Sequence, residues 1–222
     1  METLNNVGPG VPSQISKLFR EKADILFFKK GQLIYHQGST PLGAYFVDKG
    51  KVKISKTGSQ GKEKILKIAV ESELLSFSDL FSRRRYQTTA ETLEESHLLF
   101  ISKGDFWKVL ETHHELILHL LWRVAEDIDK TEETMTDLAY KPVRGRLADA
   151  ILTLDKNFNG ENNSSHFICL KRTDLAGYVG TVKETVNRFL SDLREEKVIS
   201  TIGSCIEILN FDRLQKISKL YN

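Results

Sequence analysis

The period of the hydrophobic pattern changes near Phe106, and this change limits the fold more than any other feature of the sequence. Between residues 33 and 101, short apolar runs alternate with polar residues and are separated by glycine and polar clusters. Beyond Phe106 the apolar residues recur at spacings of three and four. Alternation predicts strands with one buried face, and spacings of three and four predict helices. The sequence therefore indicates an α+β protein whose N-terminal part is a β sandwich or jelly roll.

Tight turns separate the predicted strands. The apolar run at residues 44–47 is followed by Lys49 and Gly50, which predict a hairpin turn leading into the alternating strand of Val52 and Ile54. Residues 57–62 predict a second loop, after which an apolar strand resumes at residues 65–68. Short strands at this spacing favour a jelly roll, although they do not require one.

Residues 106–139 predict one long helix with a coiled-coil seam. The seam keeps its register for about three heptads, without the drift of an ordinary amphipathic helix. A parallel helix from a second subunit would cover it, so the sequence predicts a homodimer. The alternative is a helix packed on its own β domain. The predicted seam residues are Ile117, Leu121, Val124, Ile128, Thr131, Met135 and Leu138.

The helical pattern is interrupted at residues 140–142, because Pro142 disfavours a helical conformation of the residue before it. We therefore expect residues 1–139 to form a jelly-roll sensor domain with the dimerisation helix, and residues 140–222 to form a second domain. A further helix at residues 143–154 would bury Leu147, Ile151 and Leu154, and an exposed loop would follow at residues 157–165.

Two amphipathic stretches in the second domain, residues 173–179 and 182–196, are joined only by Gly180 and Thr181. So short a link sets consecutive helices at a steep angle and is typical of a helix-turn-helix. Gly180 permits the tight turn. The apolar residues predicted to hold the two helices together are Leu175, Ala176 and Val179 in the first, and Val186, Phe189, Leu190 and Leu193 in the second.

The opposite face of the second helix carries the side chains that would read DNA in the major groove. Arg188 can donate two hydrogen bonds to guanine, and Glu184 can accept one from cytosine. The alternative for Glu184 and Arg188, spaced four residues apart, is a surface ion pair. Phosphate anchoring is assigned to Lys171 and Arg172, because charge nearly cancels along the second helix. The full predicted DNA-binding set is Lys171, Arg172, Thr181, Lys183, Glu184, Asn187 and Arg188.

A wing and a last helix are predicted to follow. Residues 198–201 and 205–208 alternate like strands and are separated by Gly203 and Ser204, which predict a hairpin. Residues 212–220 predict a short final helix.

Composition excludes several classes of protein. The chain has two cysteines, Cys169 and Cys205, too few for a disulfide framework or a four-cysteine metal site, and their apolar neighbours favour buried free thiols. Residues 1–13 are polar and lack the features of a secretory signal, and no apolar run approaches a membrane span, so a cytoplasmic protein without a membrane partner is expected. No phosphate-binding glycine loop, nucleophile elbow or metal motif predicts an enzyme.

From about Ile15 to its C-terminus, the chain resembles the Crp/Fnr superfamily of bacterial transcription regulators. This resemblance implies a cyclic-nucleotide-binding-like jelly roll and a winged helix-turn-helix, with Lys183, Glu184 and Arg188 reading the half-site and Arg172 gripping phosphate. The motifs that carry it are Gly31-Gln32-Leu33-Ile34-Tyr35-His36-Gln37-Gly38, Tyr45-Phe46-Val47-Asp48-Lys49-Gly50-Lys51-Val52 and Gly180-Thr181-Val182-Lys183-Glu184-Thr185-Val186-Asn187-Arg188.

The predicted effector pocket departs from the pattern of members that bind cyclic AMP. Where those carry Gly-Glu and Arg-Ser pairs, this sequence places Ser76-Phe77 and Gln87-Thr88. A phenyl ring cannot accept a hydrogen bond from a ribose hydroxyl, and an amide cannot replace a guanidinium on phosphate. Binding of cyclic AMP is therefore not expected; the alternative is that Arg83, Arg84 and Arg85, which lie nearby in the sequence, supply the missing guanidinium. The predicted pocket residues are Ser76, Phe77, Gln87, Thr88, Thr131 and Glu132.

Other cofactors are not expected either. The family's iron–sulfur branch uses an N-terminal cysteine cluster, and no cysteine precedes Cys169. The six histidines form no recognisable haem-ligand pair. The expected partners are palindromic double-stranded DNA, a second copy of the chain, an unidentified small-molecule effector and RNA polymerase. The alternative is a nucleotide-sensing or interaction module without a role on DNA.

Overall fold

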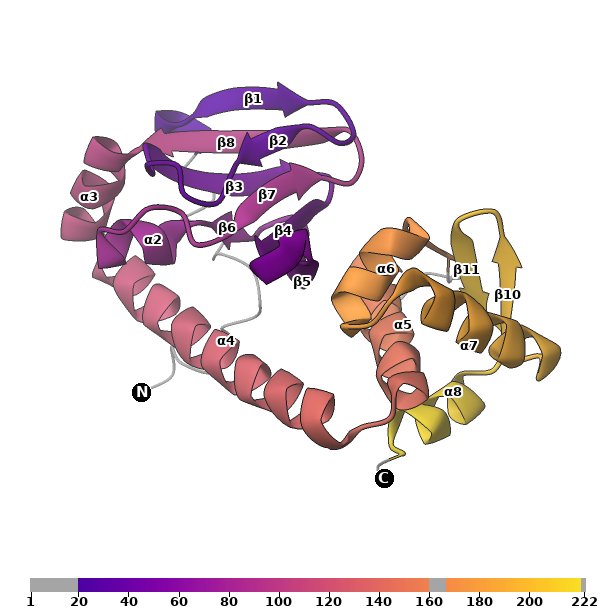
Figure 1. The fold of residues 1–222 in the computed structure, drawn as a ribbon. Helices are drawn as coiled ribbons and strands as arrows, with labels where there is room; N and C mark the ends of the chain where they lie inside the picture. Colours follow the sequence, from indigo (N-terminus) through magenta and orange to yellow (C-terminus); the bar gives the residue numbers. More distant parts are fainter. Residues whose placement is uncertain (1–19, 160–166, 221–222) are drawn as a thin grey trace. The chain divides into compact units, whose positions relative to one another are not determined.

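The computed structural model describes residues 20–159 and 167–220 (Figure 1). The chain divides into two compact units, residues 1–129 and 130–222. The predicted N-terminal lead-in, residues 1–13, and the part of the predicted loop at residues 160–165 lie outside the described residues.

The first unit contains two four-stranded sheets, in the orders β1-β8-β3-β6 and β2-β7-β4-β5. Every described pairing within them is antiparallel. This is the jelly roll that the alternating pattern predicted. The strands are β1 (Asp24–Phe28), β2 (Leu33–Tyr35), β3 (Gly43–Lys49), β4 (Val52–Thr57), β5 (Glu63–Ala69), β6 (Leu74–Leu75), β7 (Thr89–Thr92) and β8 (Ser96–Ser102).

One predicted hairpin is wrong and the other is confirmed. β3 pairs with β6 and β8, whereas β4 pairs with β5 and β7, so the turn at Gly50 carries the chain from one sheet to the other. Gly50 adopts a positive φ of 103°, and a Cβ there would lie 2.9 Å from the Ser96 backbone. The β4–β5 hairpin forms as expected, with a 3₁₀ turn, η1 (Ser59–Gly61), in its loop.

The core of the first unit has two parts. One lies between the two sheets and includes Val47, Val52 and Leu98. The other joins the β3–β8 sheet to three helices and includes Phe46 and Phe106. These helices are α2 (Phe77–Ser82), α3 (Lys103–Thr112) and α4 (His114–Tyr140), and in Figure 1 α2 and α3 lie at the same end of the roll. Burial of these side chains is the main favourable contribution to the fold of the roll.

The predicted helix at residues 106–139 is two helices, because the backbone breaks at His113 (φ −131°, ψ 79°). The His113 N–H still donates to the carbonyl of Val109, which closes α3. α4 then packs on the roll through Leu116 and Leu120, both buried. No helix within residues 20–159 or 167–220 is long and apolar enough to cross a membrane.

A buried ion pair fixes α4 to the roll. The Arg123 guanidinium, 9% exposed, donates to Glu73 just before β6 at 2.9 Å, and to Glu126 on its own helix at 3.0 Å. The second carboxylate oxygen of Glu73 accepts the Val70 N–H at 3.2 Å. Both charges are therefore compensated, as buried charges must be.

α4 ends at Tyr140, so the predicted interruption at residues 140–142 is present. α5 (Val143–Asn159) runs further than predicted and buries Leu147, Ile151 and Leu154 as expected. A three-stranded sheet in the order β10-β11-β9 follows, with β9 missed by the sequence analysis. The remaining elements are β9 (Phe167–Cys169), α6 (Arg172–Val179), α7 (Lys183–Glu195), β10 (Ile199–Ile202), β11 (Cys205–Ile208) and α8 (Phe211–Ser218).

Candidate DNA-binding interface and signal pocket

α6 and α7 form the predicted helix-turn-helix. Gly180 adopts a positive φ of 76°, and its N–H and that of Thr181 both donate to the carbonyl of Ala176. This closes α6 and turns the chain into α7 within three residues. The inner faces predicted from the sequence are buried, except Phe189, which is half-buried; the buried residues are Leu175, Ala176, Val179, Val186, Leu190 and Leu193.

The outer face of α7 is free to contact a ligand. Lys183, Glu184, Asn187 and Arg188 are all exposed, and Thr181 is half-buried at the turn. Within the described part of the chain, no ion pair joins Glu184 to Arg188. The Arg188 guanidinium instead lies over the Phe189 ring, 5.0 Å from its centroid. A cation held over an aromatic face keeps its N–H donors available at the rim.

The Arg172 side chain donates hydrogen bonds to the turn of the wing hairpin. Its Nη1 donates to the Ser204 carbonyl at 3.0 Å and its Nη2 to the Gly203 carbonyl at 3.1 Å. Burial lowers the pKa of this guanidinium from its ordinary value. Arg172 therefore holds the turn between β10 and β11 at the start of α6, whereas Lys171, one residue earlier, is exposed.

The two cysteines are joined, which corrects the prediction of buried free thiols. Cys169 on β9 and Cys205 on β11 stand opposite each other in the register and form a disulfide, with Cα atoms 4.0 Å apart. Cys169 is exposed and Cys205 half-buried. Their neighbours Ile168 and Ile206 are buried, and alternation then places both cysteines on the outer face. That alternation was the signal the sequence analysis overlooked.

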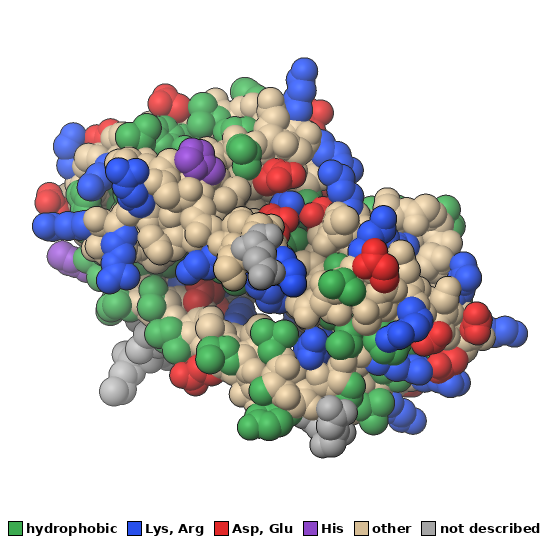
Figure 2. Space-filling model, viewed as in Figure 1, with side chains coloured by type: hydrophobic (Ala, Val, Ile, Leu, Met, Phe, Trp, Pro, Cys, Tyr) green, Lys and Arg blue, Asp and Glu red, His purple; other side chains and the backbone are tan. Residues whose placement is uncertain are grey.

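The seam of α4 is exposed on the chain, apart from Ile117, which packs against the core of the roll. The helix therefore buries one stripe, including Leu116 and Leu120, and a second apolar stripe is exposed in the part of the chain that the structure describes. Figure 2 shows hydrophobic side chains, in green, at the surface along this helix. The exposed seam residues are Leu121, Val124, Ile128, Thr131, Met135 and Leu138.

Tyrosine rings occupy the interior of the roll beside α2. Tyr35 and Tyr86 stack with ring centroids 4.1 Å apart, and Tyr45 lies 6.0 Å from Tyr35. Burial raises the pKa of Tyr86 to about 12, despite a hydrogen bond with Ser76. Tyr35 hydrogen-bonds with Thr88, and burial likewise raises its pKa. Two predicted pocket residues, Ser76 and Thr88, therefore serve as partners of buried phenols.

The other predicted pocket residues have different surroundings. Phe77, the first residue of α2, is buried in the core, and Gln87 is exposed and donates to the Arg85 carbonyl at 2.7 Å. Thr131 and Glu132 are exposed on the C-terminal part of α4, which belongs to the second compact unit.

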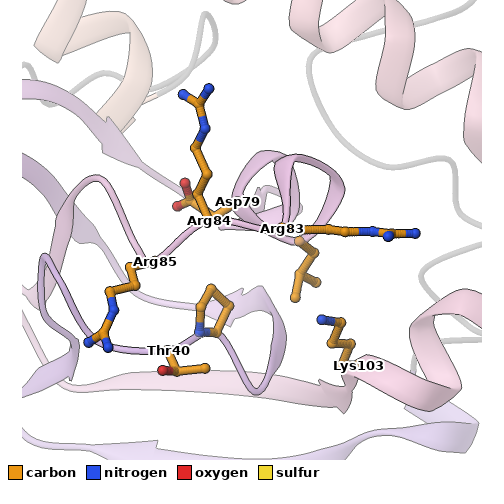
Figure 3. A pocket seen from close by; sticks show the side chains of 8 residues that line it. Thr40, Asp79, Arg83, Arg84, Arg85 and Lys103 are labelled. Carbon is orange, nitrogen blue, oxygen red and sulfur yellow. The ribbon is translucent and has the colours of Figure 1, made fainter.

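A cavity of about 120 Å³ lies beside α2, and its lining includes Arg83, Arg84 and Arg85, the alternative phosphate ligands of the sequence analysis. In liquid water this volume holds roughly four molecules. Arg83, Arg84 and Arg85 follow α2, and Lys103 begins α3; Figure 3 shows the arginine side chains pointing in different directions around the opening. Buried Asp79 is its one acidic lining residue, with a pKa raised by burial. The cavity lining therefore carries four basic side chains and one carboxyl group.

Comparisons with known proteins agree with both units. Residues 25–113 match the model of the cyclic nucleotide-binding domain, and residues 145–217 match that of the Crp-like helix-turn-helix domain. The "Anaerobic regulatory protein" of Bacillus subtilis is 27% identical over 175 residues, covering 78% of this chain and 74% of the relative. The "CRP-like cAMP-activated global transcriptional regulator" of Mycobacterium tuberculosis is 25% identical over 207 residues, 92% of each chain.

The fold is also found among solved structures. FixK2 from Bradyrhizobium japonicum superimposes with a TM-score of 0.77 at 21% identity, covering 89% of this chain and 98% of that one. CLP from Xanthomonas campestris gives 0.77 at 18% identity, covering 89% and 99%. CLP is described as a global regulator that links cell-cell signalling to virulence gene expression. With a sensor-type roll followed by a Crp-like helix-turn-helix, this chain belongs to the Crp/Fnr family of DNA-binding transcription regulators.

Proposed function

We propose that this regulator is a homodimer that binds a palindromic operator and reads each half-site with α7. The observation that carries the proposal is that α7 has one face packed against the protein and another face exposed. Val186, Leu190 and Leu193 are buried against the protein, while Lys183, Glu184 and Arg188 project outward. A packed inner face with an outward polar face is what a recognition helix in the major groove requires. The alternative, a module without a role on DNA, gives no reason for this arrangement.

Two neighbouring residues have different roles in phosphate anchoring in this proposal. Lys171 is exposed and contacts a phosphate directly, whereas Arg172 positions the wing turn through Gly203 and Ser204. Such contacts fix the register on DNA, and base contacts from α7 supply the specificity. A homodimer formed through the exposed seam on α4 has the two-fold symmetry that a palindromic operator requires.

Selection from a random double-stranded DNA pool tests the function. The purified chain is expected to enrich an inverted repeat whose half-site centres lie about 34 to 36 Å apart, one turn of B-DNA, because a two-fold symmetric dimer presents two copies of α7. Enrichment of a single, unrepeated site, or of no site, would contradict the proposal.

We further propose that the roll responds to a ligand other than cyclic AMP. The stacked phenols of Tyr35 and Tyr86, with their partners Thr88 and Ser76, fill the interior beside α2. The cationic cavity at Arg83, Arg84 and Lys103 suits a small anion instead.

Calorimetry separates these two ligand classes. Cyclic AMP is expected to give no binding heat at micromolar concentrations and no change in DNA affinity. Pyrophosphate, used as the probe anion, is expected to bind, and the double variant Arg83→Ala with Arg84→Ala to bind it at least about tenfold more weakly, since roughly 1.4 kcal/mol of charge-assisted contact is lost. A micromolar dissociation constant for cyclic AMP would overturn the first expectation. Equal pyrophosphate binding by the chain and the variant would overturn the second.

A further inference from the structure

Three contacts tie the wing turn to the start of the helix-turn-helix. The disulfide joins Cys205, directly after the turn, to Cys169, three residues before α6. The Leu170 N–H donates to the Ser204 carbonyl at 3.4 Å, and Arg172 donates to Gly203 and Ser204. Of these three contacts the disulfide alone is covalent, and it alone can be opened and closed by chemistry.

The cross-link stands where reagents can reach it. Cys169 is exposed and lies on the outer face of the small sheet. On the inner face, Ile168 and Ile206 are buried opposite each other, so the β9–β11 pairing has an apolar anchor of its own. The sheet can therefore persist when the sulfurs separate, which distinguishes this pair from a disulfide that holds a small fold together.

The family's role argues against a purely structural bond. A regulator of transcription works beside the chromosome, where thiol reductants keep most cysteines reduced, and disulfides that form there are mostly redox-sensing or catalytic. Exposed disulfides are also the labile ones. We propose that Cys169 and Cys205 are a thiol–disulfide exchange site that controls the DNA affinity of the wing, the hairpin of β10 and β11. This inference rests on the DNA-binding role proposed above.

The exchange balances with a dithiol as the reductant. One thiolate of the dithiol attacks the exposed sulfur of Cys169, the S–S bond breaks, and Cys205 leaves as a thiolate that takes up a proton. The second thiolate of the reductant then closes its own disulfide and releases Cys169. Two electrons pass to the protein and the dithiol becomes a cyclic disulfide. Oxidation is the reverse step, with a small disulfide as the co-reactant.

The closed form is expected to bind DNA more tightly, because a pre-ordered wing loses less conformational freedom on binding. The full-length chain is equilibrated with dithiothreitol and its cyclic disulfide at a series of ratios, and free thiols are counted by alkylation and mass spectrometry. DNA affinity is measured on the same samples. We expect both quantities to follow one titration curve, with the reduced form roughly three- to tenfold weaker at every sequence.

The double variant Cys169→Ser with Cys205→Ser is the matched control. It is expected to bind DNA with the affinity of the reduced chain. That affinity should not change with the ratio of dithiothreitol to its cyclic disulfide. Thiols that titrate without any change in affinity, or cysteines that never pair under the oxidising mixtures, would overturn the inference while leaving the DNA-binding role intact. If neither redox form binds DNA, the proposed function itself fails, so the two failures are distinguishable. The wild-type titration decides the matter even if the variant does not fold.

Discussion

Replacing Arg188 by alanine is expected to abolish most of the preference of this regulator for its operator while preserving much of its general attraction to DNA. The exposed guanidinium can donate to two acceptors of one guanine, a contact worth about 1 to 3 kcal/mol of discrimination. The ratio of specific to non-specific affinity should therefore fall roughly 5- to 140-fold. Fluorescence anisotropy on matched and scrambled sites, at two salt concentrations, measures this ratio.

Lys171→Ala provides the contrast. It should weaken binding to all sequences about equally and reduce the salt dependence by about one phosphate's share, because a phosphate contact carries no sequence information. Glu184→Gln should change the preference mainly at one base pair, where the carboxylate accepts from cytosine. An unchanged specificity ratio in the Arg188 variant would mean that α7 does not read the operator.

Aspartate at both Val124 and Ile128 is expected to convert the proposed dimer into a monomer. These side chains are 37% and 53% exposed on one chain, so the substitutions leave the core of the protomer intact. In a parallel dimer they would bring four carboxylates together in an apolar seam, where uncompensated charge costs several kcal/mol. Light scattering on the purified variant measures the mass directly, and binding to the palindromic operator should fall with it.

Two controls make the result specific to the seam. Leucine at the same two positions preserves apolar volume and should preserve the dimer. Thr136→Asp places a charge at an exposed position of α4 outside the seam and should have no effect on mass. A doubly substituted aspartate variant that still has the mass of a dimer would show that the chains associate elsewhere.

The sequence predicts most of the second unit because its signals are local. The α6–α7 turn needs only Gly180 and the apolar residues within one helical turn of it. β9 was missed because three residues, Phe167–Cys169, carry too little periodicity to be recognised without their partner β11. The disulfide depends on that same pairing across a separation of 36 residues. Non-local pairing is what a pattern within one segment cannot supply.

The first unit shows the same limit on a larger scale. Alternation correctly indicated strands, yet it could not show that β3 and β4, separated by the turn at Gly50, belong to different sheets. The break at His113 also escaped the pattern, because helical spacing continues on both sides of it. The candidate site on α7 was predictable because its outward residues follow from which face is apolar. The tyrosine-filled interior was not, because Tyr35 and Tyr86 meet only in the folded roll.

The ion pair between Arg123 and Glu73 couples the position of α4 to that of the turn before β6. Any signal that displaces the turn before β6 must either carry the helix with it or leave a buried guanidinium unpaired, at a cost of about 3 to 5 kcal/mol. From Arg123 to Tyr140, its last residue, α4 extends about 25 Å. A 5° tilt of the helix about Arg123 therefore moves its C-terminal end by about 2 Å.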